Sequence, residues 1–255
     1  MPLPGLERAP VMRLLPSGRS LAVGLGLVAA AAGLYALART TPMFAVQRID
    51  VVGAPAPVAA HVRNALRPVE GRSLLALQPG EVERRLASLP DVAAAGYDRD
   101  FPHTLRVTVR AEHPVAVVRK GSKAWLVAAS TRTIGAVPLR THLGLPRIWL
   151  AQPDDPEVGA AITDRLDLRA VRALALAHAA GFRGRIRMVR VRAHELTFVL
   201  GSGIELRLGD LRAVPLKLAV AERVLPGLVA AGRYRYLDVT VAARPVAATT
   251  LNAQP

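Results

Sequence analysis

The chain has 255 residues, of which 51% are hydrophobic and 4% aromatic, and it carries a formal net charge of +15. This length and apolar content suffice to bury a core, which argues against disorder throughout. The absence of cysteine excludes disulfides, thiolate zinc sites, iron–sulfur clusters and cysteine nucleophiles. Basic residues are spread along the chain and alternate with apolar ones, as in 185–192, so the charge favours a solvated basic exterior over a nucleic-acid site.

The first predicted element is a membrane-spanning helix. The run from Leu21 to Ala38 contains no charged residue and lies between Arg19 and Arg39. As a helix it would be about 27 Å long, close to the thickness of the hydrocarbon core of a bilayer. We expect a transmembrane helix over 20–38 and a cytoplasmic segment over 1–19, because more arginines precede the span than closely follow it.

Three other interpretations of this run are open. The glycines of 24–29 match a loose dinucleotide-binding fingerprint, but no strand precedes them. A cleaved signal peptide would fit the small residues at Ala36 and Ala38, although the apolar run is longer than the usual signal core. A buried core helix would need surroundings more hydrophobic than the rest of the chain supplies. We therefore favour an uncleaved anchor.

Five predicted elements follow in the order β-α-α-β-β. Residues 46–52 and 92–99 read as strands, and a third strand near 105–110 follows a turn at Phe101-Pro102. Prolines open the two helices, whose apolar stripes are Val58, Val62 and Leu66 after Pro57, and Val82, Leu86 and Leu89 after Pro79. Such a unit packs two helices on one face of a three-stranded sheet and leaves an edge strand open.

The second half of the chain predicts a β-rich domain with helices. A short strand is predicted at 125–127, but the Asp and Gly that would mark a hairpin turn do not follow it, so a hairpin there stays unassigned. The proline-containing run 151–163 reads as an exposed loop. Strands over 196–200 and 204–208 flank Gly201-Ser202-Gly203 and predict a hairpin. The remaining predictions are a helical stripe of Leu168, Val171 and Ala175, a helix over 216–225 and a last strand over 236–241.

Several of these segments resemble the FtsQ/DivIB family of bacterial cell-division proteins. The segments 44–53, 71–74, 89–92 and 112–116 resemble its POTRA module. The later hairpin, the helix that carries Lys217 and the strand before Pro245 resemble its second domain in their order. The resemblance implies an α+β fold with a POTRA domain over 44–112, an FtsQ-type β domain over 113–243 and a tail over 244–255.

The same resemblance implies a function. It describes a non-enzymatic divisome scaffold in the plasma membrane, single-pass and type II, enriched at the septum. Its expected partners are FtsB- and FtsL-like single-pass proteins and the lipid bilayer, with no nucleic acid, small-molecule substrate or cofactor. Two alternatives from other classes are an anchored accessory POTRA protein of translocation or secretion and an anchored nucleic-acid binder.

The residues that could carry chemistry form no recognisable catalytic, metal or cofactor site. The histidines stand apart, without metal-ligand spacing, at His61, His103, His113, His142, His178 and His194. The Asp154-Asp155 pair lies in the predicted loop, and Ser202 lacks the strand-turn-helix context of a nucleophile elbow. Glu195 and Glu205 would face each other only in a particular hairpin register.

Function is therefore expected to lie in a surface, and the last strand is the candidate. Pro245 cannot donate to a β-ladder, and no later segment alternates like a strand, so we expect a free sheet edge there. The POTRA edge is the alternative docking edge. The predicted partner-binding residues are Leu237, Asp238, Val239, Thr240, Val241, Ala242, Arg244 and Pro245.

Overall fold

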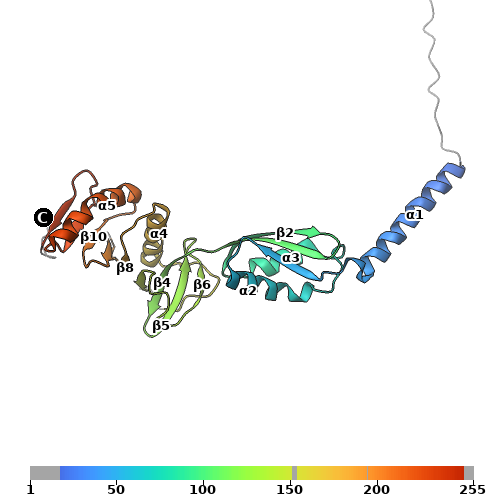
Figure 1. Cartoon of the computed structure of the whole chain (residues 1–255), viewed down its shortest axis with the longest axis horizontal. Coiled ribbons are helices and arrows are strands. Elements are labelled where there is room, and N and C mark those ends of the chain that lie inside the picture. The colour runs from blue at the N-terminus through green and yellow to red at the C-terminus, as the bar shows by residue number, and fades with distance from the viewer. Residues whose placement is uncertain (1–17, 151–153, 194, 250–255) are drawn as a thin grey trace, which may run out of the picture.

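The computed structural model describes residues 18–150, 154–193 and 195–249. Helix α1 (Gly18–Thr40) extends from one end of the molecule, a three-stranded sheet with two helices follows, and a nine-stranded sheet with two further helices lies at the other end (Figure 1). Both sheets are covered by helices, and the fold is α+β, as predicted from the sequence.

Helix α1 is long and apolar enough to cross a membrane. Its segment Leu21–Thr40 has 20 residues and a mean hydropathy of 2.1. No part of it is buried in the protein, and Leu25 is 72% exposed. The interpretation as a buried core helix is therefore wrong, because α1 packs against neither sheet. Its length of about 30 Å matches the hydrocarbon core of a bilayer.

The first sheet has the predicted β-α-α-β-β connectivity, with β3 at its centre. Strand β3 runs parallel to β1 and antiparallel to β2. The helices lie on one face of this sheet (Figure 1). The elements are β1 (Arg48–Val52), α2 (Ala56–Leu66), α3 (Pro79–Ala87), β2 (Val92–Asp100) and β3 (Thr104–Ala111), with short 3₁₀ helices η1 (Pro42–Phe44) and η2 (Arg67–Val69).

The alternation in the sequence accounts for the core of this unit. In β3, Leu105, Val107 and Val109 are buried while the intervening residues face solvent. Buried residues of α2 and α3 pack on them, namely Val62, Leu66, Val82 and Leu86. Leu89 packs on the same core from beyond the end of α3, so the predicted helix stripe is slightly too long.

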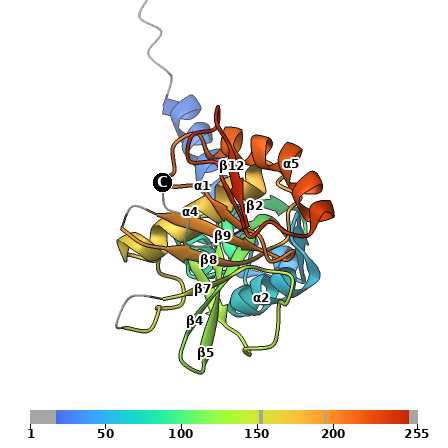
Figure 2. The same cartoon turned by 90° about the vertical axis from the view of Figure 1, so that its left-hand side faces the viewer.

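The second sheet has the strand order β12-β11-β10-β9-β8-β7-β4-β5-β6. Helices α4 (Arg165–Ala179) and α5 (Val214–Ala231) cover one of its faces (Figure 2). The strands are β4 (Pro114–Lys120), β5 (Lys123–Ala128), β6 (Thr133–Ala136), β7 (Arg147–Trp149), β8 (Ile186–Val191), β9 (Leu196–Leu200), β10 (Glu205–Arg207), β11 (Tyr236–Asp238) and β12 (Val246–Ala248).

The helices of this domain differ in detail from the prediction. In α4, Val171 is buried, but Leu168 and Ala175 are only half-buried, and the core face includes Ala170 and Leu174 instead. Helix α5 is longer than the predicted 216–225 and contains Pro226. It continues to Gly232, which takes a φ of +67° and ends the helix.

A hairpin joins β5 and β6 although the sequence lacks the usual turn residues. Thr131 takes the left-handed conformation at φ +74°, where a glycine would be unstrained. The Ala128 N–H donates to the Arg132 carbonyl at 2.9 Å, and the Ile162 N–H donates to the Thr131 carbonyl at 3.0 Å. These bonds hold a turn that local sequence preference alone would not favour.

The end of the chain corrects two predictions. The last predicted strand over 236–241 ends in the structure at Asp238, and β12 then pairs antiparallel with β11. The prediction that no later segment covers this strand is therefore wrong, because β12 pairs with it. The assignment of 244–255 as a tail is wrong for the residues that form β12. The three residues of β12 are too few to display an alternation, and pairing with β11 defines the strand.

We predict that Leu86→Asp unfolds the three-stranded unit without unfolding the nine-stranded one. Leu86 is 2% exposed, and a carboxylate placed there should lower the free energy of unfolding by roughly 3–5 kcal/mol. Hydrogen exchange should accelerate across β1, β2 and β3 and stay unchanged in β9. Arg84→Asp, at an exposed position of α3, is the control and should cost less than about 1 kcal/mol. Unchanged exchange in the Leu86 variant would contradict the assigned core.

Candidate partner-docking edge

Strand β12 forms an edge of the nine-stranded sheet. It pairs with β11 in the register Tyr236↔Ala248, Leu237↔Ala247 and Asp238↔Val246. Among the described strands, β11 is its only neighbour, so its other side offers backbone groups that an incoming strand could pair with. The free edge therefore lies one strand beyond the predicted position.

The predicted partner-binding residues divide into two groups. Leu237 and Val239 are fully buried and belong to the core, and Asp238 is half-buried within β11. The others lie in the segment that leads into β12. Of these, Ala242 is half-buried, and the exposed ones are Thr240, Val241, Arg244 and Pro245.

A tight turn brings the chain from β11 to β12. Asp238 Oδ1 accepts a hydrogen bond from the Thr240 N–H at 2.8 Å, an Asx-type turn that redirects the backbone. The Val239 N–H donates to the Arg207 carbonyl at 2.9 Å. Gly209 lies against this turn at φ +68°, where a Cβ atom would be 2.7 Å from Thr240 Cγ2. Any other residue there would adopt a strained φ and would press on the Thr240 side chain.

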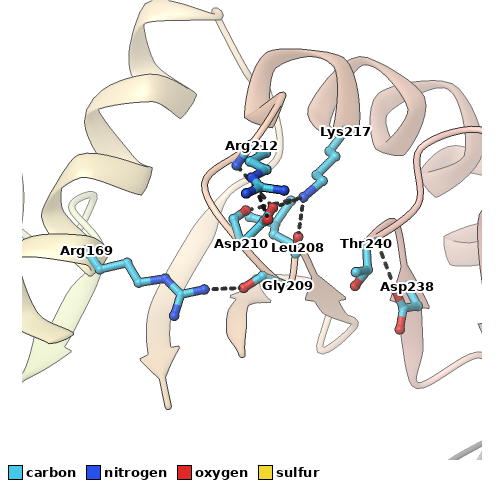
Figure 3. Close-up of polar contacts among 8 residues, drawn as sticks. All are labelled: Arg169, Leu208, Gly209, Asp210, Arg212, Lys217, Asp238 and Thr240. Carbon is cyan, nitrogen blue, oxygen red and sulfur yellow. Dashed lines mark hydrogen bonds and ion pairs between the residues drawn. The ribbon is translucent and has the colours of Figure 1, made fainter. Parts of the chain in front are cut away.

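The loop that carries Gly209 is held by a buried lysine. Lys217 is 4% exposed, and its Nζ donates to the Leu208 carbonyl at 2.7 Å, the Asp210 carbonyl at 3.3 Å and Asp210 Oδ1 at 2.7 Å (Figure 3). An ammonium group has three donors, and these three acceptors satisfy them. The sequence marked Lys217 by resemblance, but only the structure reveals that it organises the loop.

Two further contacts fix the same loop. Arg169 of α4 donates to the Gly209 carbonyl (Figure 3). The hydrogen bond from Lys217 holds the pKa of the Asp210 carboxyl below its ordinary value of 3.8, and the Arg212 N–H, which also donates to this carboxylate, acts in the same direction. Both helices thus position the loop that supports the turn before β12.

The histidines are not gathered into a site in the described part of the chain. His61 Nδ1 lies 2.6 Å from Asp91 Oδ2, and His103 Nδ1 lies 3.3 Å from the Ala45 carbonyl. His194 lies outside the described residues. Among the residues that are described, no group of three or more His, Asp or Glu side chains could hold a metal ion.

The other candidates for chemistry have structural surroundings. Asp155 pairs with Lys123 and with Lys120, which lower its pKa, so it is not part of an acidic metal pair with Asp154. Glu205 lies opposite Val199, not Glu195, and it pairs with Arg190 at 2.8 Å. Ser202 lies in the β9–β10 turn, where its Oγ accepts from the Ile204 N–H at 3.4 Å.

The three-stranded unit defines the class of protein. Residues 44–110 match the family described as POTRA domain, FtsQ-type. The chain is thus a protein with an FtsQ-type POTRA domain, preceded by one apolar helix and followed by a β-rich region.

Relatives extend this result beyond the POTRA domain. Cell division protein FtsQ of Streptomyces venezuelae is 26% identical over 242 residues, which cover 91% of this chain and 84% of the relative. Cell division protein FtsQ of Mycobacteroides abscessus is 33% identical over 114 residues, or 45% of this chain and 34% of the relative. The resemblance inferred from the sequence is confirmed, because the chain is similar to FtsQ cell division proteins over most of its length.

The Lys217–Asp210 pair makes a pH-dependent contribution to stability. We expect Asp210→Asn to lower the free energy of unfolding by about 1–3 kcal/mol near neutral pH, because the buried ammonium loses its charged acceptor. The depressed pKa of Asp210 means that this contribution is present above the ordinary value of 3.8 and is lost as pH falls through the lower folded-state value.

Urea unfolding of the wild-type chain and the variant at about pH 7 and about pH 2 would measure this. The deficit of the variant should be smaller at the acidic pH. Asp154→Asn, at an exposed carboxylate, is the matched control and should show no deficit at either pH. A deficit of equal size at both pH values would assign the effect to packing of the amide and not to charge.

Proposed function

We propose that the chain is a non-enzymatic scaffold of the division septum, anchored by α1 in the plasma membrane with its N-terminus in the cytoplasm. The observation that carries this proposal is the similarity to a cell division protein over 91% of the chain. The exposed apolar helix supports the anchor, and the larger number of arginines before the span supports the orientation. The extracytoplasmic part would comprise a POTRA domain over 44–112 and a β domain over 113–243 together with β12.

In this proposal the scaffold binds FtsB- and FtsL-like single-pass proteins through the edge at β12. A partner strand would hydrogen-bond to the free side of β12, and the exposed residues from Thr240 to Pro245 would flank it. Anchoring both proteins in one membrane raises their effective concentration, so a short added strand can suffice for recruitment. The lipid bilayer is the second partner, and neither a cofactor, a small-molecule substrate nor nucleic acid is part of the mechanism.

The cell-division proposal is favoured over the two alternatives. Both relatives are named as cell division proteins, which supports a septal role over translocation or secretion. The basic residues do not form a continuous run, which favours a protein partner over nucleic acid.

An N-terminal fluorescent fusion tests the anchor and the septal role together. We expect full-length fusion protein and fluorescence concentrated at the division site, because an uncleaved α1 keeps the label joined to the ectodomain. A fusion to residues 1–43 alone is the control and should label the membrane without septal enrichment. A cleaved fragment that ends near Ala38 would contradict the anchor, and even distribution of the full-length fusion would contradict the scaffold.

Proline substitutions in β12 test the docking edge. The amides of Ala247 and Ala248 point to opposite sides of the strand, so one faces β11 and the other faces the free edge. Proline removes the amide without deleting a large side chain. We expect one variant to lower the melting temperature, and the other to keep the fold but bind a soluble FtsB-like partner at least about tenfold more weakly.

The two positions act as controls for each other, because each receives the same substitution in the same short strand. Binding would be measured by calorimetry, and folding by thermal unfolding. If both proline variants stay folded and bind the partner as tightly as the wild-type chain, β12 is not the docking edge. The edge strands β1 and β2 of the POTRA domain would then become the candidates.

A further inference from the structure

The face of the nine-stranded sheet opposite α4 and α5 carries a cluster of arginines along β8. The sequence from Arg183 to Arg192 alternates basic and apolar residues and contains no acid. Arg185, Arg187 and Arg190 are all exposed. These residues account for part of the net charge, but neither the anchor nor the β12 edge uses them.

A β-bulge in β8 places the consecutive residues Arg187 and Met188 at one hollow. Ile186 pairs with Leu200 and Met188 pairs with Val199, so Arg187 is an extra residue between two ladder positions. Such a bulge changes the direction of a side chain relative to regular alternation. As a result the neighbours Arg187 and Met188 both line the hollow, which Arg185 also lines.

The hollow is lined by apolar residues and arginines. It measures about 520 Å³, and Met188, Val199, Leu143 and Leu145 supply most of its apolar lining. Three arginines, Ile186 and Trp149 complete it, and none of the described residues that line it is acidic. Leu143 is 64% exposed and Trp149 is 56% exposed, so large apolar groups remain open to solvent there.

The arginines at and beside the hollow differ in the groups that they pair with. The guanidinium of Arg147 donates to the Leu139 carbonyl at 3.2 Å and so holds the loop that forms one wall. Arg190, outside the hollow, is paired with Glu205. Arg185 and Arg187 have no carboxylate within salt-bridge distance in the part of the chain that the structure describes. Positive charge without a carboxylate partner therefore lies at the hollow.

The indole of Trp149 contacts a further arginine at this site. The guanidinium of Arg119 lies 4.9 Å from its ring centroid in a cation–π contact. A tryptophan beside arginines is typical of the residues that dominate protein interfaces.

We propose that this hollow binds an acidic protein segment that inserts an aliphatic side chain between the arginines. Carboxylates of the segment would pair with Arg185 and Arg187, and its apolar group would cover Met188 and Val199. An anionic polymer without apolar groups would pair with the arginines but leave Met188 and Val199 exposed to water. Strands β8 and β12 are separated by three strands, about 19 Å, so this surface is distinct from the β12 edge and both can be occupied together.

Tryptophan fluorescence of the full chain in nanodiscs of zwitterionic lipid tests the proposal. The chain has two tryptophans, and Trp125 is only 6% exposed, so a response to added ligand reports on Trp149. The probe is a short synthetic peptide that alternates glutamate and leucine. We expect it to shift the emission, and Trp149→Phe should abolish that response.

Matched variants separate specific binding from general charge attraction. Arg185→Glu with Arg187→Glu should raise the Kd at least about tenfold, and Leu143→Ser should raise it severalfold. Arg172→Glu with Arg223→Glu makes the same charge change at exposed positions of α4 and α5 and should alter the Kd less than about twofold. Thermal unfolding would verify that each variant is folded.

Three results would overturn the proposal. The first is equal weakening by the two double variants, which would indicate unspecific attraction. The second is equal affinity for a peptide that alternates glutamate and serine, which would favour an anionic polymer as the occupant. The third is the absence of any emission change with the glutamate–leucine peptide.

Discussion

The last strands of the large sheet depend on the buried ammonium of Lys217. Burying a cation costs several kcal/mol unless its donors are satisfied, and here two carbonyls and one carboxylate satisfy all three. The geometry of those acceptors fixes the loop between β10 and α5. Gly209 in that loop leaves room for the turn at Thr240. This turn leads the chain from β11 into β12, which pairs with it. One charged side chain in the core thus holds the loop that lies against the turn before the edge that we propose for partner binding.

The two sheets are joined with little free chain between them. Only Glu112 and His113 separate β3 from β4, and the Glu112 N–H donates to the Asp91 carbonyl at 2.9 Å. Arg132, beside the strained Thr131, donates to the Val92 carbonyl at 3.4 Å and the Gly159 carbonyl at 2.6 Å. The strained turn therefore has a structural consequence, because it carries the arginine that spans from the second sheet to the first. A partner held at either sheet would be restricted in orientation relative to the other.

The sequence predicted the elements whose pattern is local. Leu105, Val107 and Val109 alternate over a full strand, and the glycines at 201 and 203 mark the β9–β10 hairpin, so both were found. Strand β12 and the hairpin at Thr131 were missed because pairing with distant segments, not local preference, stabilises them. The same holds for the candidate site: Leu237 to Pro245 lie next to the edge, but the edge itself is a strand with no alternation to detect. The bulge at Arg187 likewise depends on the register with β9, which the sequence does not specify.

The arrangement of surfaces on the large sheet has a consequence for how partners can assemble. Helices α4 and α5 occupy one face, β12 ends the sheet at one edge, and the basic hollow lies on the opposite face near β8. A segment bound in the hollow would contact side chains, and its affinity would depend on salt, whereas a strand added at β12 would bond to the backbone and depend little on salt. Because the two modes use different atoms, one partner could be bound through both, or two partners could be bound at once. With the chain confined by α1 to the plane of a membrane, weak contacts of both kinds would add to a stable assembly.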